Sequence, residues 1–250
     1  MNPWTWPPSV NPEAPIFPGF DPALFDDVVI GALANGGGTF DLPGPAPGFT
    51  HRIYEQLAII PNAIGAGFVA PGISGVYNPS ALTAFSGQLT SAGVGSVQPN
   101  PIVLEAGETF RLTNGGATGP GVVWAPFYDV NEPTWTAVRM QLTAVAADVI
   151  PAPVGAALRK LVFASLIGNG GTRTLNTRNS LYNADTIGHS IEWLLGANLI
   201  LRSGNIAALL SNTSIPGAPV VSAGSGALRA RTAVAIITTP VNLFLIYESQ

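Results

Sequence analysis

The sequence predicts an all-β protein: tandem antiparallel β-sandwich or barrel lobes, preceded by an extended Pro-rich N-terminal arm that carries one short helix. Three observations support this. Beyond residue 50, apolar residues recur mostly with a period of two, the side-chain period of a strand. Clusters of Gly, Asn, Pro and Ser interrupt these segments at short intervals, as in sandwiches and barrels rather than βαβ units. The first 50 residues hold 10 of the 23 prolines, which favours an extended backbone.

The clearest strand pattern lies at residues 135–145. One face of this segment carries Val138, Met140 and Leu142, and the other carries Arg139, Gln141 and Thr143. Such alternation is typical of a half-buried strand. Further strands are expected at 158–167, 172–177, 191–195, 199–202, 233–238 and 241–247.

A short helix is expected at about 22–34. Asp21 is a good N-cap residue, and Pro22 follows at the first helical position. Phe20 and Phe25 flank this start at the positions of a hydrophobic staple. A Gly-rich sequence from Gly36 would end the helix, and a Pro/Gly linker would follow.

The domain organisation predicted from these patterns is an arm over 1–50, a first β-domain over 51–131 and a second over 135–250. The two domains show an apparent internal repeat, because Ile-Pro-Asn-Ala-Ile-Gly-Ala at 60–66 matches Ile-Pro-Ala-Pro-Val-Gly-Ala at 150–156. Each half also carries a Gly turn followed by a strand, at Gly107 and at Gly196. One large sandwich remains the alternative.

Charged residues make up only 10% of the chain, against about 25% in ordinary soluble domains. Ser, Thr, Asn, Gly and Pro must therefore cover much of the surface. A neutral, apolar surface tends to associate with other protein surfaces, so the composition favours a homo-oligomer. The alternative is a monomer whose surface carries unusually little charge.

Several partner classes are disfavoured. The chain has no cysteine for a disulfide or a thiolate metal site. Its net charge is −4, and the basic pairs Arg159-Lys160 and Arg229/Arg231 are too small for binding along a nucleic acid. Residues 56–104 carry no charge, but prolines and glycines interrupt every window that could span a membrane. No signal peptide is recognised.

The sequence also shows no residue pattern typical of a catalytic or metal-binding site. His51 and His189 have no carboxylates at the spacing of a metal site. Asp129 and Glu132 bracket a segment that could ligate Ca²⁺, but a solvated turn is the simpler interpretation. Asp26 and Asp27 are adjacent and would not face each other on a helix. The sequence therefore predicts a protein that is not an enzyme and binds no cofactor or metal.

The arm contains four large apolar side chains that could anchor it to a surface. They are Trp4, Trp6, Phe17 and Phe20. A disordered tail is usually poor in aromatic residues, so we expect the arm to dock, either on its own body or on a neighbour. A mobile tail is the alternative.

A family resemblance rests on two segments. Residues 149–164 read Val-Ile-Pro-Ala-Pro-Val-Gly-Ala-Ala-Leu-Arg-Lys-Leu-Val-Phe-Ala, and residues 168–177 read Gly-Asn-Gly-Gly-Thr-Arg-Thr-Leu-Asn-Thr. Their succession of turns and strands resembles that of small virion proteins of tailed bacteriophages. The resemblance covers roughly 140–250, and a weaker similarity covers 57–130. It implies no catalytic or binding residue.

The resemblance implies a non-catalytic capsid decoration (cement) protein, located in the virion and assembled in the host cytoplasm. Such a protein would form a homo-oligomer, most simply a trimer, and would bridge major capsid proteins. The long arm would equally suit a neck or tail component. A receptor- or carbohydrate-binding domain of a tail fibre is a further alternative, and it would need exposed aromatic residues such as Trp124, Trp135 or Trp193.

Overall fold

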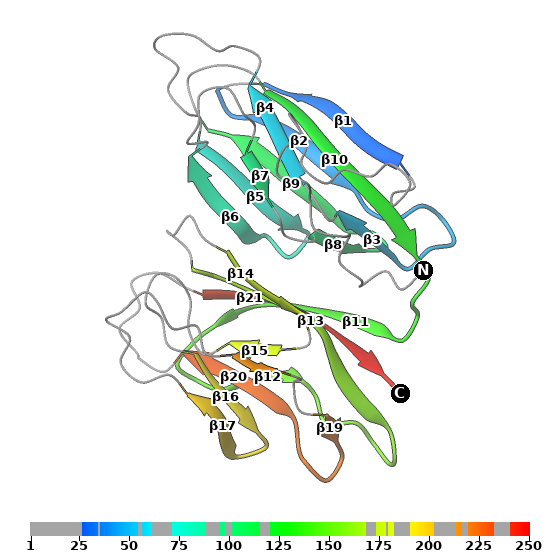
Figure 1. Ribbon diagram of the computed structural model, residues 1–250, viewed down its shortest axis with the longest axis vertical. Coiled ribbons are helices and arrows are strands. Elements are labelled where there is room, and N and C mark those ends of the chain that lie inside the picture. The colour runs from blue at the N-terminus through cyan, green and yellow to red at the C-terminus, as the bar shows by residue number, and fades with distance from the viewer. Residues whose placement is uncertain are drawn as a thin grey trace. The chain divides into compact units, whose positions relative to one another are not determined.

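Strands are the only regular secondary structure among the residues that the computed structural model describes, which confirms the all-β prediction (Figure 1). Those residues are 27–34, 36–54, 57–61, 72–88, 96–98, 102–115, 121–168, 174–178, 180–182, 191–202, 214–216, 220–232 and 241–250. The strands fall into two compact units, with β5, β6 and β11–β21 in the second. That 51–131 and 135–250 are independent domains stays a prediction.

Unit 1 is organised around one long strand, β10. The strands of this unit are β1 (Asp27–Leu33), β2 (Gly38–Pro43), β3 (His51–Tyr54), β4 (Leu57–Pro61), β7 (Ser96–Gln98), β8 (Ile102–Glu105), β9 (Thr109–Asn114) and β10 (Gly121–Val130). β10 pairs antiparallel with β1, β4 and β3, and lies between β1 and β4 in Figure 1. β7 extends this sheet from β4 and β8 extends it from β3, while β2 pairs with β9 in another sheet.

The helix expected at about 22–34 is wrong for the described part of that range. Residues 27–33 form strand β1, whereas 22–26 lie outside the described residues. Three consecutive β-branched residues, Val28, Val29 and Ile30, favour an extended backbone. β10 supplies the pairing partner for all seven residues of β1. Residues 38–43, expected in a linker, likewise form β2, so the Pro-rich arm does not extend to residue 50.

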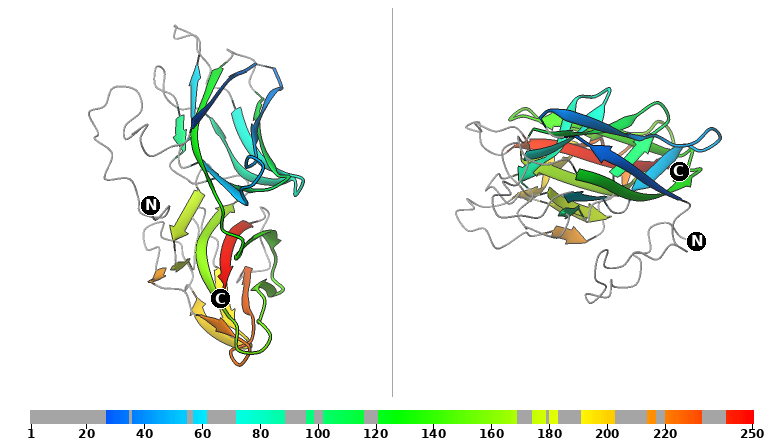
Figure 2. Two further views of the ribbon diagram at one scale, coloured as in Figure 1. Left: turned by 90° about the vertical axis from the view of Figure 1, so that its right-hand side faces the viewer. Right: turned by 90° about the horizontal axis from the view of Figure 1, so that it is seen from above.

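Unit 2 consists of two larger sheets, a short strand pair and a hairpin. Its strands are β5 (Gly72–Asn78), β6 (Leu82–Gln88), β11 (Trp135–Leu142), β12 (Ala147–Ile150), β13 (Leu158–Gly168), β14 (Thr174–Arg178), β15 (Ser180–Tyr182), β16 (Ile191–Leu195), β17 (Asn198–Arg202), β18 (Ser214–Pro216), β19 (Val221–Ser222), β20 (Leu228–Thr232) and β21 (Val241–Ser249). One sheet has the order β11-β21-β13-β14, with β19 also on β13, and the other has the order β12-β20-β16-β17. Both views show β21, in red, beside β13 (Figures 1 and 2).

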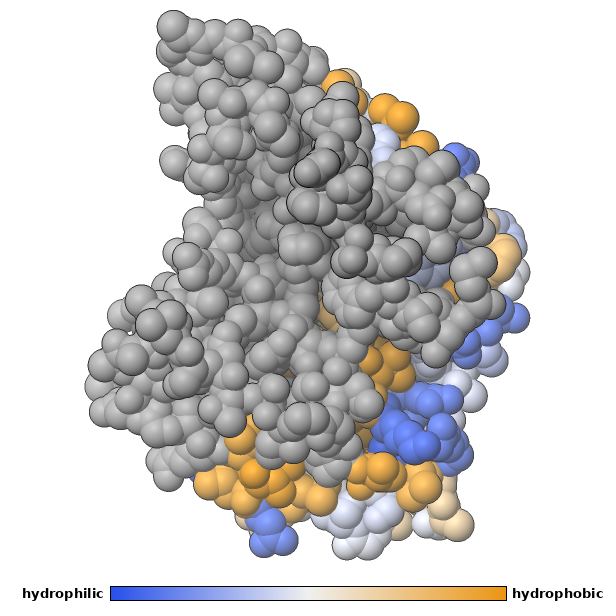
Figure 3. All heavy atoms as spheres, in the orientation of Figure 1, coloured by the Kyte–Doolittle hydropathy of each residue, from blue (hydrophilic) through white to orange (hydrophobic). Residues whose placement is uncertain are grey.

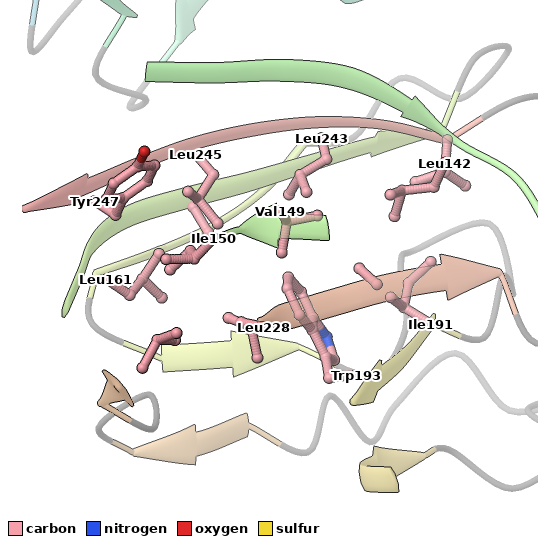
Figure 4. Packing of buried hydrophobic residues seen from close by; sticks show 14 residues of the cluster. Leu142, Val149, Ile150, Leu161, Ile191, Trp193, Leu228, Leu243, Leu245 and Tyr247 are labelled. Atoms are coloured by element: carbon pink, nitrogen blue, oxygen red, sulfur yellow. The ribbon is translucent and has the colours of Figure 1, made fainter. Parts of the chain in front are cut away.

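The core of unit 2 lies between its two larger sheets, and both sheets contribute to it (Figure 4). Trp193 on β16 is fully buried there, with Leu243 and Leu245 of β21. The predicted inner face of 135–145 is confirmed, because Leu142 belongs to the cluster and Val138 and Met140 pack against it. The expected strands at 158–167, 172–177, 191–195, 199–202 and 241–247 are confirmed as β13, β14, β16, β17 and β21. The one expected at 233–238 lies outside the described residues.

The two glycine turns of the apparent repeat share a backbone conformation but connect different pairings. Gly107 and Gly196 both have positive φ, at 85° and 61°, a region that costs glycine little. After Gly196 the chain turns back, so β17 pairs with β16. After Gly107 the chain changes sheets instead, since β8 pairs with β3 and β9 pairs with β2. The sequence likeness therefore reflects similar turns within different strand pairings.

Candidate functional site

The most enclosed ion pair among the described residues of unit 1 joins Arg52 of β3 and Asp129 of β10. The two residues are direct cross-strand partners. The Arg52 side chain donates two hydrogen bonds, Nε to Oδ1 at 2.7 Å and Nη2 to Oδ2 at 2.8 Å. The backbone N–H of Ala46 also donates to Asp129 Oδ2, at 3.1 Å. This two-bond geometry fixes the register of β3 on β10.

Aromatic rings enclose this ion pair. The Arg52 guanidinium lies 3.8 Å from the centroid of the Phe127 ring, and Tyr54 contacts the same ring. The Tyr54 hydroxyl donates to the carbonyl of Pro43 at 2.7 Å. Burial raises the pKa of Tyr54 to about 12, and neighbouring Arg52 opposes only part of that effect. Burial alone would lower the pKa of Arg52, but hydrogen bonds to Asp129 and Tyr54 raise it overall.

These contacts bear on the calcium hypothesis. Asp129 accepts hydrogen bonds at both carboxylate oxygens, from the Arg52 side chain and from the N–H of Ala46. The carbonyl of Glu132 accepts a hydrogen bond from the N–H of Trp135 in the turn before β11. The simpler interpretation, a turn, therefore describes this segment. Within the described ranges, no group of three His, Asp or Glu side chains is arranged to hold a metal ion.

Three further ion pairs repeat the cross-strand arrangement. Arg111 Nη2 lies 2.7 Å from Asp41 Oδ2, Arg229 Nε lies 3.0 Å from Asp148 Oδ1, and Arg231 Nε lies 2.5 Å from Glu192 Oε2. In each case the two residues face each other in the strand register. The bonds to Arg111 lower the pKa of Asp41, and the same bonds raise the pKa of Arg111. Opposite charges placed this way stabilise a sheet modestly.

Two other arginines lie against aromatic rings. The Arg139 guanidinium lies 4.2 Å from the ring centroid of Tyr77, and that of Arg159 lies 5.3 Å from the ring centroid of Tyr247. Arg159 Nη1 also donates to the carbonyl of Pro151 at 2.7 Å. Among the basic residues noted in the sequence, Arg229 and Arg231 each face a carboxylate, and Arg159 lies on a ring.

His51, the described histidine, belongs to a contact between neighbouring strands β3 and β8. His51 is buried on β3, with its Nδ1 2.8 Å from the Thr50 hydroxyl and its Nε2 3.7 Å from Glu105 Oε1. Glu105 is the cross-strand partner of His51 on β8. His189 and Asp26 lie outside the described residues. Asp27 accepts a hydrogen bond from the N–H of Val28, which follows it.

The three tryptophans that an exposed sugar platform would need are buried. Trp124 and Trp135 are each 9% exposed, and Trp193 is 0% exposed. They occupy β10, β11 and β16 and serve as core residues. The arm residues Trp4, Trp6, Phe17 and Phe20 lie outside the described residues, so their docking stays a prediction. None of the elements described is a helix long and apolar enough to cross a bilayer.

Sequence reasoning missed one surface, the outer edge of β1. Ile30 on this strand is 62% exposed, although the helix interpretation placed this segment in the arm. The β-branched run from Val28 to Ile30 is the signal that could have revealed a strand here.

No protein-family model matches the sequence, and no curated protein matches it. The structure has a loose similarity to three solved viral structures. The major capsid protein P2 from bacteriophage PM2 is 11% identical, with 90% of this chain and 98% of that chain covered and a TM-score of 0.30. A chain from the atomic structure of Sulfolobus Turreted Icosahedral Virus is 12% identical, with 88% and 59% covered and a TM-score of 0.27.

The third structure, described as a triple jelly roll fold and turret assembly in an archaeal virus, is 13% identical, with 90% and 60% covered and a TM-score of 0.25. This chain thus spans about 60% of the length of two of the three. At these identities and TM-scores, no residue role carries over to this protein.

Proposed function

We propose that this chain is a non-catalytic structural protein of a virus particle. The observation that carries the proposal is the way its few charges are used. Charged residues are 10% of the chain, and four described arginines face a carboxylate directly across a strand pair. The remaining exterior must be largely neutral. Such a surface suits a protein that is surrounded by other protein, because little charge has to be desolvated on contact.

Within this class, we propose a capsid decoration (cement) protein that bridges major capsid proteins. The resemblance of 149–164 and 168–177 to tailed-phage virion proteins supports this choice. The β-sandwich core of unit 2 provides a rigid body of the kind that a shell component needs. The subunit would act as a homotrimer in the virion, after assembly in the host cytoplasm. It would need no cofactor, nucleic acid or membrane.

The arm would fasten the subunit through Trp4, Trp6, Phe17 and Phe20. An aromatic side chain buries about 150–250 Å². At about 25 cal/mol per Å², four of them provide on the order of 15 kcal/mol before the cost of ordering the arm. The prolines reduce that cost, because they restrict the free arm. The arm would lie across a neighbouring subunit or the shell beneath.

The test is the location and copy number of the protein in particles of the virus that encodes it. Immunogold labelling and quantitative mass spectrometry of purified particles should find many copies distributed over the shell. A few copies at a single vertex would replace the cement role with the neck or tail role. Absence from purified particles would reject a virion function altogether.

A further inference from the structure

Strand β1 forms an edge of its sheet. Among the strands that the structure describes, β1 pairs only with β10. Natural proteins protect such edges with lysine, proline, inward-pointing charge or a bulge. β1 has none of these after Asp27, because it continues as Val-Val-Ile-Gly-Ala-Leu and keeps an unbroken register along β10.

The two faces of β1 differ in their surroundings. On the inner face, Leu33 is fully buried, and a Cβ added at Gly31 would lie 1.9 Å from Cε2 of Phe40. Alternation along a strand therefore places Val28, Ile30 and Ala32 on the outer face. Ile30 is 62% exposed and Ala32 is also exposed. Figure 3 shows hydrophobic atoms along the margin of the molecule where Figure 1 places β1.

The backbone of β1 indicates which residues present hydrogen-bonding groups to the open edge. The N–H of Val28 donates to Oδ1 of Asp27 at 2.8 Å, so it is directed away from β10. In an antiparallel ladder, the groups facing one neighbour recur at every second residue. The N–H and C=O groups of Ile30 and Ala32 therefore face the same open edge as those of Val28.

We propose that β1 pairs antiparallel with β1 of a second copy of this chain, about a two-fold axis at Ile30. Ile30 then faces Ile30, and Val28 faces Ala32 in both directions. The Val28 N–H would exchange its bond to Asp27 for one to the carbonyl of the partner's Ala32. This inference goes beyond the proposed virion function and does not depend on it.

The charge pattern of β1 favours its own copy as the partner. Self-pairing centred on Ile30 sets each Asp27 opposite Leu33 of the other copy, so no two charged residues of β1 face each other. The two Asp27 carboxylates lie at opposite ends, about 20 Å apart at roughly 3.4 Å per residue. That separation exceeds the Debye length of about 8 Å at physiological ionic strength. Like charges thus do not oppose the pairing.

The symmetry of this contact determines what it can join. A two-fold contact uses the same patch on both subunits, whereas the subunits of a three-fold ring meet through two different patches. β1 pairing would therefore link one trimer to another. In a monomeric protein it would produce a dimer.

A cysteine cross-link tests the register. The chain has no cysteine, so Ile30→Cys introduces a single thiol. In the proposed pairing the two Ile30 Cα atoms are about 5.5 Å apart, which lies within the range that a disulfide spans. Val145→Cys is the matched control, because Val145 is another exposed aliphatic residue, 76% exposed, in unit 2. Under mild oxidation, Ile30→Cys should form a covalent dimer on non-reducing gels and Val145→Cys should not.

A charge substitution tests the same contact by sedimentation velocity over a range of concentrations. Ile30→Lys places two like charges opposite each other at the two-fold axis, so this association should be lost, while Val145→Lys should retain it. Circular dichroism reports whether each variant folds, and the cross-link decides if Ile30→Lys does not fold. Failure of Ile30→Cys to cross-link, or equal cross-linking by both cysteine variants, would overturn the proposal. Absence of the protein from virus particles would reject the proposed function and leave this pairing standing.

Discussion

Arg52 and Asp129 form a two-bond ion pair across β3 and β10 in which only 9% and 6% of the side chains are exposed. Arg111 and Asp41 form the same two bonds across β9 and β2, but with 48% and 39% exposed. Both are Arg–Asp pairs at directly opposite positions within unit 1. The same two-bond Arg–Asp arrangement thus occurs once with buried side chains and once with exposed side chains.

The first prediction compares these ion pairs. Asp129→Ala should lower the free energy of unfolding by about 3–5 kcal/mol, because it leaves a buried guanidinium without its carboxylate. Asp41→Ala should lower it by about 1 kcal/mol or less, since water screens the exposed pair. Urea unfolding followed by tryptophan fluorescence measures both. Equal losses in the two variants would show that burial does not control the strength of these pairs.

The second prediction concerns alkaline pH. The pKa of Tyr54 is raised to about 12 in the folded protein, against about 10 in an unfolded chain. Above pH 10 the unfolded state loses this proton first, so stability is complete below pH 10 and falls as the pH rises toward 12. The loss should be on the order of 2 kcal/mol.

Tyr54→Phe isolates this contribution. The variant loses the hydroxyl that donates to Pro43 and should be about 1 kcal/mol less stable at neutral pH. The difference in stability between wild type and variant should shrink as the pH rises above 10 and should change sign before pH 12, because the loss of about 2 kcal/mol exceeds the initial advantage of about 1 kcal/mol. A difference that stays constant over this interval would mean that Tyr54 ionises equally in both states.

The third prediction concerns two glycines in adjacent turns of unit 2. Gly196 and Gly226 have φ of 61° and 75°, and a Cβ on Gly226 would lie 2.9 Å from the Cα of Gly196. Gly226→Ala therefore combines backbone strain with a clash against backbone, and should cost more than about 2 kcal/mol. Gly155→Ala is the control, because Gly155 has φ of 70° and nothing within 4 Å of the added Cβ. Thermal unfolding should show the smaller loss for Gly155→Ala.

The fourth prediction concerns the arm. Deleting residues 1–20 should leave a folded protein that attaches poorly to virus particles, because the deletion removes all four proposed anchors. Substituting Trp4, Trp6, Phe17 and Phe20 together by Ser keeps the chain length and should have the same effect. Particle occupancy and melting temperature are measured on both variants. A lower melting temperature with normal occupancy would show that the arm covers its own domain instead.

The sequence was sufficient to predict the strands that are marked by an alternating pattern of apolar residues within the strand itself. The alternation of Val138, Met140 and Leu142 identified both β11 and its inner face. The same local reasoning failed at β1, where Asp21, Pro22 and Phe25 gave a helix start that competed with the β-branched run after Asp27. Local capping signals describe near neighbours only. The pairing of β1 with β10 joins residues about a hundred positions apart, as with Asp27 and Phe127, and no local pattern encodes it.

The ion pairs were beyond prediction for a related reason. Neither Arg52 nor Asp129 belongs to a motif that would predict their pairing. The sequence suggested a calcium ligand or a solvated turn for Asp129. Their relationship depends on the register of β3 against β10. A slip of one residue would turn the two side chains to opposite faces, so the pair is visible only once the register is known.

The central position of β10 also determines when unit 1 can form during protein synthesis. β1, β3 and β4 all pair with β10 and all emerge from the ribosome before it. Translation proceeds at about 5–20 residues per second, so β1 waits on the order of ten seconds for its partner. During that interval, apolar strands with open edges are exposed outside the ribosome. We therefore expect nascent unit 1 to bind holding chaperones and to complete its sheet only after Val130 has left the exit tunnel.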